Sequence, residues 1–509
     1  MKSPLAVLRL FALLALAPAA LHAADAVAPV TPDASPEARA LLQLLHDISG
    51  RSTFTGQHNY PNVHGRNSVF AARTIGKTPV IWGTDLGFAK DGDTDSYLGR
   101  PDIVQEAIAQ HRRGAIVALC WHAVPPTADE PVTFRPLPGA DPDRLASVQG
   151  QLTDAQFQAV LTPGTDLYNH WCEQVDRIAG FLQQLQNAHV PVLWRPYHEM
   201  NGTWFWWGGR TEGKYTTAAL YCQMFDRLVN HHQLRNLVWV WSVDRVHGPA
   251  MAHAKYFPGL DRVDVLALDV YGNDFAPAYY DSLVELAHGK PLALAEVGNP
   301  PSPEVLAQQP RWTYYMTWAG MVRNTTPEAY AALLGDPRIL NLDDARYADV
   351  TAAYRAACGL PRVDPAPLPP DFSGLWVLNE AASQLGRFGA AGAPAHLEIS
   401  DHGDALTIRS VRVVEYADNQ VAEETVRLDG SESKSEFMNA PRVTTAHRSA
   451  DGGTITMEST IHFPWGPPGS TATETSTWSL RDGGRVLAIE RTAVSPAGRQ
   501  ETTQLFDKR

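Results

Sequence analysis

Two glutamates, Glu199 and Glu296, have the sequence surroundings of a catalytic carboxylate pair. Glu199 ends the segment Trp194–Glu199, in which an apolar run gives way to Arg-Pro-Tyr-His-Glu. Glu296 ends a second apolar run and is followed by Val-Gly. Two carboxylates can cleave a glycosidic bond when one protonates the leaving oxygen and the other attacks the anomeric carbon. This pair is therefore a candidate for that chemistry.

Such a pair needs two different environments. The nucleophile must be ionised, whereas the acid must hold its proton near neutral pH, so it needs drier or more anionic surroundings. Arg195 is a candidate for keeping Glu296 charged, and His198 is placed to orient the pair or tune the acid. A second interpretation stays open, in which both glutamates belong to structural ion pairs, because perturbed carboxylates also occur in such networks.

The chain from residue 39 to residue 360 alternates short apolar runs with helical patterns, which predicts a (β/α)8 TIM barrel of the α/β class. Helical patterns include Ile103–His111, Tyr168–Gln186 and Thr216–His231. Eight runs are predicted strands: Thr53–Thr55, Thr78–Trp82, Ala115–Trp121, Pro191–Trp194, Leu237–Trp241, Val263–Val270, Pro291–Ala295 and Tyr314–Trp318. Reactive residues of such barrels follow the carboxyl ends of the strands. Glu199 follows the fourth predicted strand and Glu296 the seventh.

The two ends of the chain differ from this pattern. Residues 1–24 have basic residues, a short apolar run and small residues, in the order of a cleaved signal peptide, so a secreted or periplasmic protein is expected. Residues 361–371 contain five prolines and are predicted to be a linker. Residues 372–509 show short alternating runs separated by glycine turns, which predicts a small all-β domain, either a barrel or a sandwich.

The segment Asp371–Asn379, with Gly-Leu-Trp at its centre, resembles the start of a lipocalin-like barrel. This second domain has only three tryptophans, Trp376, Trp465 and Trp478. Carbohydrate binding is one possible role. A packing or stabilising role is the interpretation we favour, because small barrels commonly fill their interior with such side chains.

The composition narrows the set of partners. The formal net charge is −13, which disfavours nucleic acid and anionic membranes and makes a neutral partner more plausible. No metal and no cofactor is expected, because no group of His, Asp, Glu or Cys has ligand spacing. Cys172 and Cys222 lie on neighbouring predicted helices, where a disulfide is possible but not determined by sequence. We expect a monomer.

The segments Arg195–Glu199 and Trp204–Gly208 together resemble glycoside hydrolase family 26, the β-mannanases. The resemblance covers roughly the first domain. It implies endo-hydrolysis of β-1,4-mannan, including glucomannan and galactomannan, with retention of configuration, Glu199 as the acid/base and Glu296 as the nucleophile. The alternatives are an endo-xylanase or β-glucanase of the same family and a non-catalytic glycan-binding protein.

The resemblance also implies roles for residues around the pair. By position, these substrate-binding residues are His122, Arg195, His198, Trp204, Tyr271 and Trp318. Trp206 and Trp207 are further candidates for the cleft, whereas wall packing is expected for Trp239 and Trp241. Asp85 and Asp269 also end strands, but we assign them no chemistry. The long loop from Val124 to Thr165 is placed to close one end of the cleft.

Overall fold

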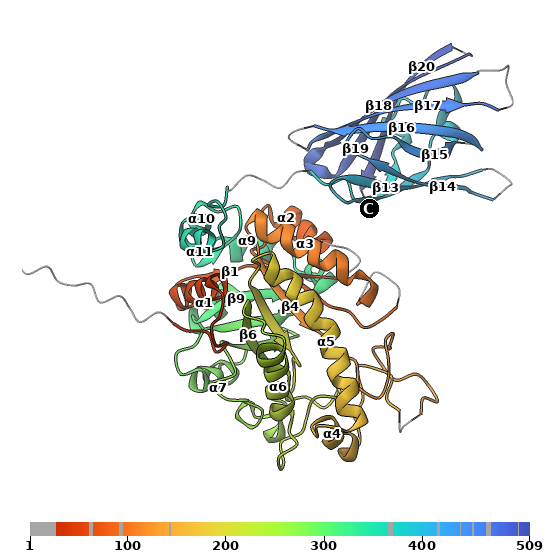
Figure 1. Ribbon diagram of the computed structural model, residues 1–509. Coiled ribbons are helices and arrows are strands. Elements are labelled where there is room, and N and C mark those ends of the chain that lie inside the picture. Colours follow the sequence, from red (N-terminus) through yellow and green to blue (C-terminus); the bar gives the residue numbers. More distant parts are fainter. Residues whose placement is uncertain are drawn as a thin grey trace, which may run out of the picture. The chain divides into compact units, whose positions relative to one another are not determined.

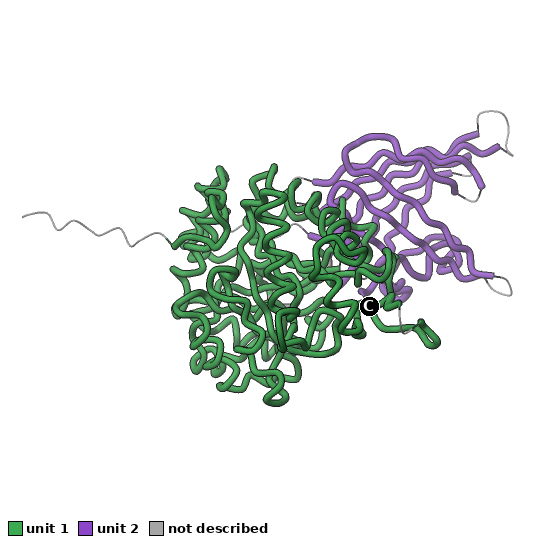
Figure 2. Tube along the Cα trace, turned by 60° about the horizontal axis from the view of Figure 1, so that its bottom comes forward, with its two compact units in different colours: residues 1–366 green, residues 367–509 purple. Residues whose placement is uncertain are grey.

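A computed structural model describes residues 27–508, apart from residues 61–64, 91–94, 142–143, 365–369, 415–417, 438, 450–451, 465–469 and 497. The chain divides into two compact units, Met1–Ala366 and Pro367–Arg509 (Figure 1 and Figure 2). The predicted signal peptide, Trp465 and part of the predicted linker lie outside the described residues.

The first unit is a closed barrel of parallel strands surrounded by helices (Figure 1), as the alternating pattern predicted. In barrel order the strands are β1 (Thr53–Phe54) with β2 (Gly56–Asn59), then β3 (Ile81–Asp85), β4 (Ile116–Trp121), β5 (Val192–Pro196), β6 (Leu237–Asp244), β7 (Val265–Val270), β8 (Leu292–Val297) and β9 (Trp312–Thr317). Strand β9 pairs with β8 on one side and with β1 and β2 on the other, which closes the barrel. A short strand, β10 (Ile339–Leu340), pairs with β1 and was not predicted.

All eight predicted barrel strands are present, but the first continues further than its apolar pattern indicated. Strand β2 has the sequence Gly-Gln-His-Asn and is buried throughout. The amide of Gln57 donates to the carbonyls of Thr317 and Ala319, at 3.1 and 2.8 Å. These bonds satisfy a polar side chain inside the barrel, where hydrophobicity alone gives no strand signal.

Helices follow most of the strands, and their starts are fixed by local caps. The Thr165 hydroxyl accepts a hydrogen bond from the Tyr168 amide at the start of α5. The predicted helix 216–231 is α6 followed by a π-helical segment, Asp226–His231. The helices are α1 (Pro36–Ile48), α2 (Arg66–Ile75), α3 (Arg100–Arg113), α4 (Asp154–Val160), α5 (Asp166–Asn187), α6 (Thr217–Phe225), α7 (Pro277–Ala287), α8 (Pro303–Gln308), α9 (Pro327–Leu334), α10 (Ala345–Val350) and α11 (Ala352–Ala357).

The start of the predicted linker is packed into the first unit. The Arg355 guanidinium donates to the Pro361 carbonyl at 3.0 Å, and Val363 is 4% exposed. A Cβ on Gly114 would approach the Val363 side chain to 2.8 Å. The first unit therefore extends to Val363, beyond the predicted boundary at residue 360. The prediction stopped early because Val363 is a single apolar residue in a proline-rich segment.

The second unit is a nearly closed barrel of ten antiparallel strands, which confirms the all-β prediction. Its strands are β11 (Gly374–Leu378), β12 (His396–Asp401), β13 (Ala405–Arg412), β14 (Gln420–Arg427), β15 (Ser433–Phe437), β16 (Ala440–Arg448), β17 (Thr454–His462), β18 (Thr471–Arg481), β19 (Val486–Ser495) and β20 (Gly498–Lys508). The order β14-β13-β12-β11-β20-β19-β18-β17-β16-β15 leaves β14 and β15 as the two edges.

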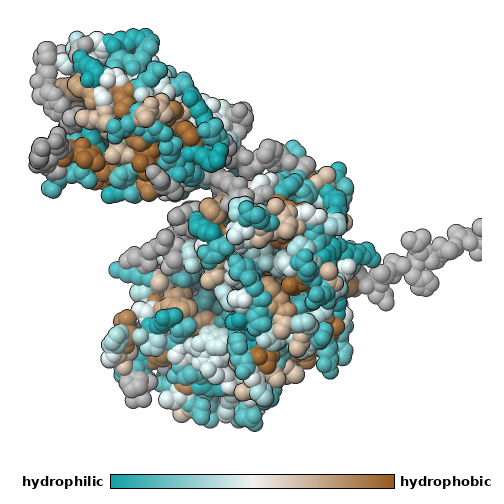
Figure 3. Space-filling view, turned by 180° about the vertical axis from the view of Figure 1, so that it is seen from behind, coloured by the Kyte–Doolittle hydropathy of each residue, from teal (hydrophilic) through white to brown (hydrophobic). Residues whose placement is uncertain are grey.

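Hydrophobic residues of the second unit fill one part of its interior. Trp376 is fully buried, and its indole donates to the Phe372 carbonyl at 2.8 Å. This tryptophan joins Leu397, Ile455 and Phe506 in one apolar cluster. Figure 3 shows hydrophobic residues gathered on one face of this unit and framed by hydrophilic ones.

The described part of the chain contains no helix whose length and hydrophobicity would suit a membrane span. All four cysteines are free thiols, so the structure contains no bridge between Cys172 and Cys222.

Candidate active site

A cavity of about 450 Å³ brings the two candidate glutamates together at the carboxyl ends of the barrel strands. The described residues that line it are Tyr60, Asp95, His122, Phe134, Gln149, His198, Glu199, Trp204, Phe205, Tyr271, Glu296 and Trp318. Of the eight predicted site residues, only Arg195 does not line this cavity.

Glu199 lies in the turn after β5, and this turn is conformationally strained. Tyr197 and Glu199 both have positive φ angles, 49° and 52°. Non-glycine residues adopt such angles rarely, and functional sites are enriched in them. The indole of Trp204 donates to Glu199 Oε2 at 2.6 Å. A Cβ on Gly202 would come within 2.2 Å of the Trp204 ring, so glycine allows the indole to reach the carboxylate.

Glu296 ends β8 and is 5% exposed. The Arg195 guanidinium donates to its Oε2 at 2.7 Å, and the Tyr271 hydroxyl donates to its Oε1. These charge-assisted bonds fix the orientation of the carboxylate. Arg195 is therefore a partner of the proposed nucleophile, which is the first of the two roles predicted for it. It lies behind Glu296, 3% exposed, and does not line the cavity, which corrects its second prediction as a substrate-binding residue.

The two glutamates are close together but have different surroundings. One carboxylate oxygen each of Glu199, Glu296 and Asp269 lie within 4.8 Å of one another. Burial, followed by the charges of Glu296 and Asp269, holds the pKa of the Glu199 carboxyl well above its usual range. Glu199 thus keeps a proton while Glu296 has a guanidinium partner, and this is the division of roles that an acid and a nucleophile require.

Asp269 supports this arrangement from below the site. Its Oδ2 accepts a hydrogen bond from Arg195 at 2.8 Å, and its Oδ1 accepts one from the Ser242 hydroxyl at 2.6 Å. One guanidinium is therefore shared between two carboxylates. Burial raises the pKa of Asp269, and Arg195 opposes that rise. No role was predicted for Asp269, but in the structure it fixes the guanidinium that holds Glu296.

Two histidines line the cavity in opposite charge environments. His122 Nδ1 lies 2.8 Å from Asp85 Oδ2, and this carboxylate also accepts from the His122 amide. Burial opposes protonation of His122, but Asp85 outweighs it and raises the pKa of His122. Burial together with Arg195 and His122 holds the pKa of His198 well below its usual range. His122 is consequently an ion-pair donor, and His198 is neutral.

Aromatic side chains form much of the cavity wall. Trp318 stacks on His58 with the two ring centroids 3.8 Å apart, so His58 fixes the position of the Trp318 ring. Flat apolar rings of this kind suit the apolar face of a sugar. Trp206 and Trp207 are fully buried, and their indoles donate to the carbonyls of Ala123 and His198, so they support the cavity from behind and do not line it.

The glycosyl hydrolase family 26 model matches residues 30–343, which contain the whole of this site. This chain belongs to glycosyl hydrolase family 26. A mannan endo-1,4-β-mannosidase of Thermothelomyces thermophilus is 32% identical over 323 residues, 62% of either chain. The chain spans 45% and 48% of the length of two mannan endo-1,4-β-mannosidases of Piromyces sp.

Solved family 26 structures have the same fold. GH26A from Muricauda sp. MAR_2010_75 is 40% identical with a TM-score of 0.56, and the match covers 61% of this chain and 98% of that one. The GH26-CBM35 β-(1,4)-mannanase of Podospora anserina is 29% identical with a TM-score of 0.52, covering 64% of this chain and 69% of that chain. The second unit, Pro367–Arg509, lies outside the residues that the family model matches.

Five cavity residues of this family 26 domain were not predicted: Tyr60, Asp95, Phe134, Gln149 and Phe205. Phe134 and Gln149 belong to the long loop 124–165, so that loop does reach the cleft, and its aromatic residues were the available signal. Asp95 had no signal. Its Oδ1 atom is buried and has no hydrogen-bond partner among the described residues. Burial raises the pKa of Asp95 to about 7.

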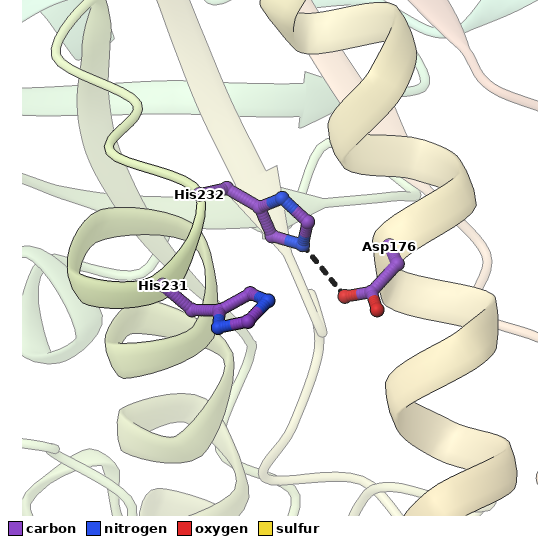
Figure 4. A group of neighbouring side chains, drawn as sticks. All are labelled: Asp176, His231 and His232. Atoms are coloured by element: carbon purple, nitrogen blue, oxygen red, sulfur yellow. Dashed lines mark hydrogen bonds and ion pairs between the residues drawn. The ribbon is translucent and has the colours of Figure 1, made fainter.

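The fold also gathers possible metal ligands that are far apart in the sequence. Asp176, His231 and His232 have ligand atoms within 4.8 Å of one another (Figure 4). Asp176 also accepts two hydrogen bonds from the Arg227 guanidinium, at 2.7 and 2.6 Å, and one from His232. Its carboxylate is therefore already neutralised by a side-chain cation, as Glu296 is by Arg195. The group around Asp176 and the group around Glu296 therefore both have the character of ion-pair networks.

Proposed function

We propose that this protein is a retaining endo-β-1,4-mannanase that uses Glu199 as acid/base and Glu296 as nucleophile. The observation that carries the proposal is the distance of at most 4.8 Å between an oxygen of Glu199, whose pKa is held well above its usual range, and an oxygen of Glu296, which accepts a hydrogen bond from Arg195. Retaining enzymes hold their carboxyl groups about 5–5.5 Å apart, whereas inverting enzymes need about 6.5–9.5 Å for an intervening water.

In the first step, Glu199 donates its proton to the glycosidic oxygen while Glu296 attacks the anomeric carbon. The glycosidic bond breaks, the new chain end leaves as an alcohol, and an ester joins the sugar to Glu296. Arg195 and Tyr271 hold the attacking carboxylate in place during this step. Glu199 is now ionised.

In the second step, Glu199 takes a proton from water, and the resulting nucleophile attacks the anomeric carbon of the ester. The bond to Glu296 breaks, and the carboxylate returns to its two donors. The ester no longer carries the negative charge that raised the pKa of Glu199, so this pKa falls and Glu199 is held in the ionised form that can accept the proton of water. Two inversions give net retention.

The substrate class rests on similarity. Several relatives of this domain are named mannan endo-1,4-β-mannosidase. The catalytic pair itself does not distinguish mannan from xylan or β-glucan, because discrimination comes from contacts to individual hydroxyl groups. Mannan, xylan and mixed-linkage β-glucan should therefore be compared, and we expect mannan to have the highest kcat/KM.

The stereochemical outcome tests the mechanism most directly. Mannohexaose hydrolysis followed by proton NMR should give products whose new anomeric centre is first β and only later mutarotates. An initial α product would contradict the proposed role of Glu296. Binding of mannohexaose without release of any reducing sugar would favour a non-catalytic glycan-binding protein.

Two variants separate the roles of the glutamates. Glu296→Ala should abolish hydrolysis of every β-mannoside, whereas Glu199→Ala should still release the activated leaving group of 2,4-dinitrophenyl β-mannobioside, which needs no proton. Azide, which needs no general base, should then accelerate turnover of Glu199→Ala. Full activity of Glu199→Ala on mannan would contradict its assignment as the acid.

We also propose that the protein is secreted or periplasmic and acts as a monomer. The basic and apolar residues at the start of the chain support the first proposal. N-terminal sequencing of the exported protein should give a new terminus near residue 24, and a terminus at Met1 would contradict this. Sedimentation velocity should give a single species of about 53 kDa, the 55.7 kDa chain less its leader.

A further inference from the structure

The barrel of the second unit encloses a cavity of about 850 Å³, which no part of the mannan-degrading mechanism uses. Volumes of roughly 300–1,000 Å³ are typical of small-molecule sites. The cavity is lined by alternate residues of several strands, as expected for the interior of an antiparallel barrel. On β13, for example, Ile408, Ser410 and Arg412 line it.

The interior changes character along the strands. At one end, Leu397, Ile408, Met457, Trp478 and Ile489 line the cavity and belong to the apolar cluster of this unit. Strand β19 then passes from Ile489 to Arg491, and β18 passes from Trp478 through Ser476 to Glu474. A molecule that fills this space must therefore be apolar at one end and polar at the other.

The buried part of the polar end has more guanidinium groups than carboxylates. Arg442 donates to Glu424 at 3.1 Å, and Arg491 forms an ion pair with Glu474. Arg412 has neither a carboxylate partner nor a hydrogen bond among the described residues, and its buried Nε atom is unsatisfied. Burial, with Arg491 nearby, lowers the pKa of this guanidinium.

The Nε atoms of Arg442 and Arg491 are also buried and unsatisfied. Three guanidinium groups thus meet two interior carboxylates. Two further glutamates, Glu423 and Glu436, line the cavity but are exposed, so water screens their charges. A buried donor left unpaired costs free energy that a ligand can recover by accepting its hydrogen bonds.

We propose that the second unit binds an amphipathic carboxylate, with one carboxylate head on an apolar body, and that the head pairs with Arg412. The apolar body lies against Met457 and Trp478. A neutral sugar would leave the charge of Arg412 without a partner, and an inorganic anion would leave the apolar end of the cavity unfilled. This site is independent of the proposed mannanase activity.

Isothermal titration calorimetry of the full chain with laurate, kept below its micellar concentration, tests the proposal. We expect one laurate per chain. Dodecyltrimethylammonium has the same tail with the opposite charge and should not bind, and inorganic phosphate has the charge without the tail and should not bind either. Equal binding of the cationic amphiphile, or no binding of laurate, would overturn the proposal.

Variants locate the head group. Arg412→Gln should weaken laurate binding about 10- to 100-fold, the value of a hydrogen-bonded charge pair. Arg409→Gln is the matched control, because Arg409 lies on the same strand but pairs with Glu398 instead of lining the cavity. We expect no change for Arg409→Gln. Unchanged binding by Arg412→Gln, or equal losses in both variants, would overturn the assignment.

Two further variants keep the test independent of folding defects. Arg412→Lys retains a charge and should bind laurate better than Arg412→Gln does. Ser410→Phe leaves every charge in place but fills the cavity, so it should abolish binding. If Ser410→Phe instead reduces the binding of mannohexaose, measured in a Glu296→Ala background to prevent cleavage, the cavity is a sugar site and the proposal is wrong.

Discussion

Removal of a single hydroxyl, in Tyr271→Phe, isolates the contribution of one donor to the proposed nucleophile. The Tyr271 hydroxyl donates to Glu296 Oε1, while Arg195 occupies the other oxygen. Burial and the Glu296 charge hold the pKa of Tyr271 well above its usual range, so the phenol remains a donor across the working pH range. The substitution changes the side-chain volume little and leaves Arg195 in place, so Glu296 loses only the hydrogen bond to its Oε1 atom.

The expected magnitude follows from the burial of this contact. Glu296 is 5% exposed, so water does not replace the lost donor easily. A hydrogen bond to a charged partner contributes about 1.5–3 kcal/mol, which corresponds to roughly a 10- to 150-fold change in rate. The second step should suffer more than the first, because the returning negative charge on Glu296 needs its donors in that transition state.

Stopped-flow kinetics with 2,4-dinitrophenyl β-mannobioside separates the two steps. Tyr271→Phe should show a burst of dinitrophenol followed by slow turnover, because the glycosyl-enzyme ester accumulates. Tyr256→Phe is the matched control, since its buried hydroxyl donates only to the Ala250 carbonyl at 3.1 Å. If Tyr271→Phe keeps the wild-type turnover while folding normally, the argument that this donor assists the leaving carboxylate is refuted.

Three further predictions concern the acid, an unassigned carboxylate and stability. The first step needs protonated Glu199, so activity is present below the raised pKa of Glu199 and lost as the pH rises through that pKa. Trp204→Phe removes the hydrogen bond that lowers this pKa, so the falling limb of the kcat/KM profile should move to higher pH. Asp95→Ala should raise KM for mannohexaose about tenfold and change kcat little, because Asp95 lines the cavity and has a buried oxygen with no hydrogen-bond partner among the described residues. Glu130→Gln should lower the free energy of unfolding by about 3–5 kcal/mol in urea, because it leaves the buried Arg100 charge unpaired.

Controls for these predictions come from the same parts of the chain. Arg177 is the exposed second partner of Glu130, and Arg177→Gln should change the unfolding free energy by less than about 1 kcal/mol. Asp102→Ala, on the exposed side of α3, should leave KM unchanged. A falling limb that stays in place or moves to lower pH in Trp204→Phe, or a normal KM in Asp95→Ala, would contradict the roles given to those residues.

Most of the barrel was predictable because its strands are buried on both faces. Runs such as Leu237–Trp241 are apolar throughout, and this pattern distinguishes them from the helices between them. The pattern failed where polar residues are buried and hydrogen-bonded, as in β2, where the Gln57 amide donates to the Thr317 carbonyl of the neighbouring strand β9. In the second unit, strand Ser433–Phe437 has the sequence Ser-Lys-Ser-Glu-Phe, which has no alternating apolar pattern and therefore no strand signal.

The candidate site was predictable where function depends on sequence neighbours. Glu199, His198 and Trp204 are close in the chain, and their order has no other simple explanation. Arg195 was predicted both to act on Glu296 and to bind substrate, and in the structure its guanidinium contacts Glu296, 101 positions away. Asp95 was missed because it belongs to the polar run Asp91-Gly-Asp93-Thr-Asp95, which has the composition of an exposed loop.

The sequence by itself determined which residues are candidates for catalysis and which strands position them. Strands buried on both faces appear as apolar runs, and their alternation with helical segments shows the strand order. Only the tertiary structure decided how the charges are divided. One guanidinium is shared by Asp269 and Glu296, and Glu199 lies within 4.8 Å of both without a salt-bridge partner among the described residues. Proton affinity depends on burial and on charges that are neighbours in space, and neither quantity is present in the order of the residues.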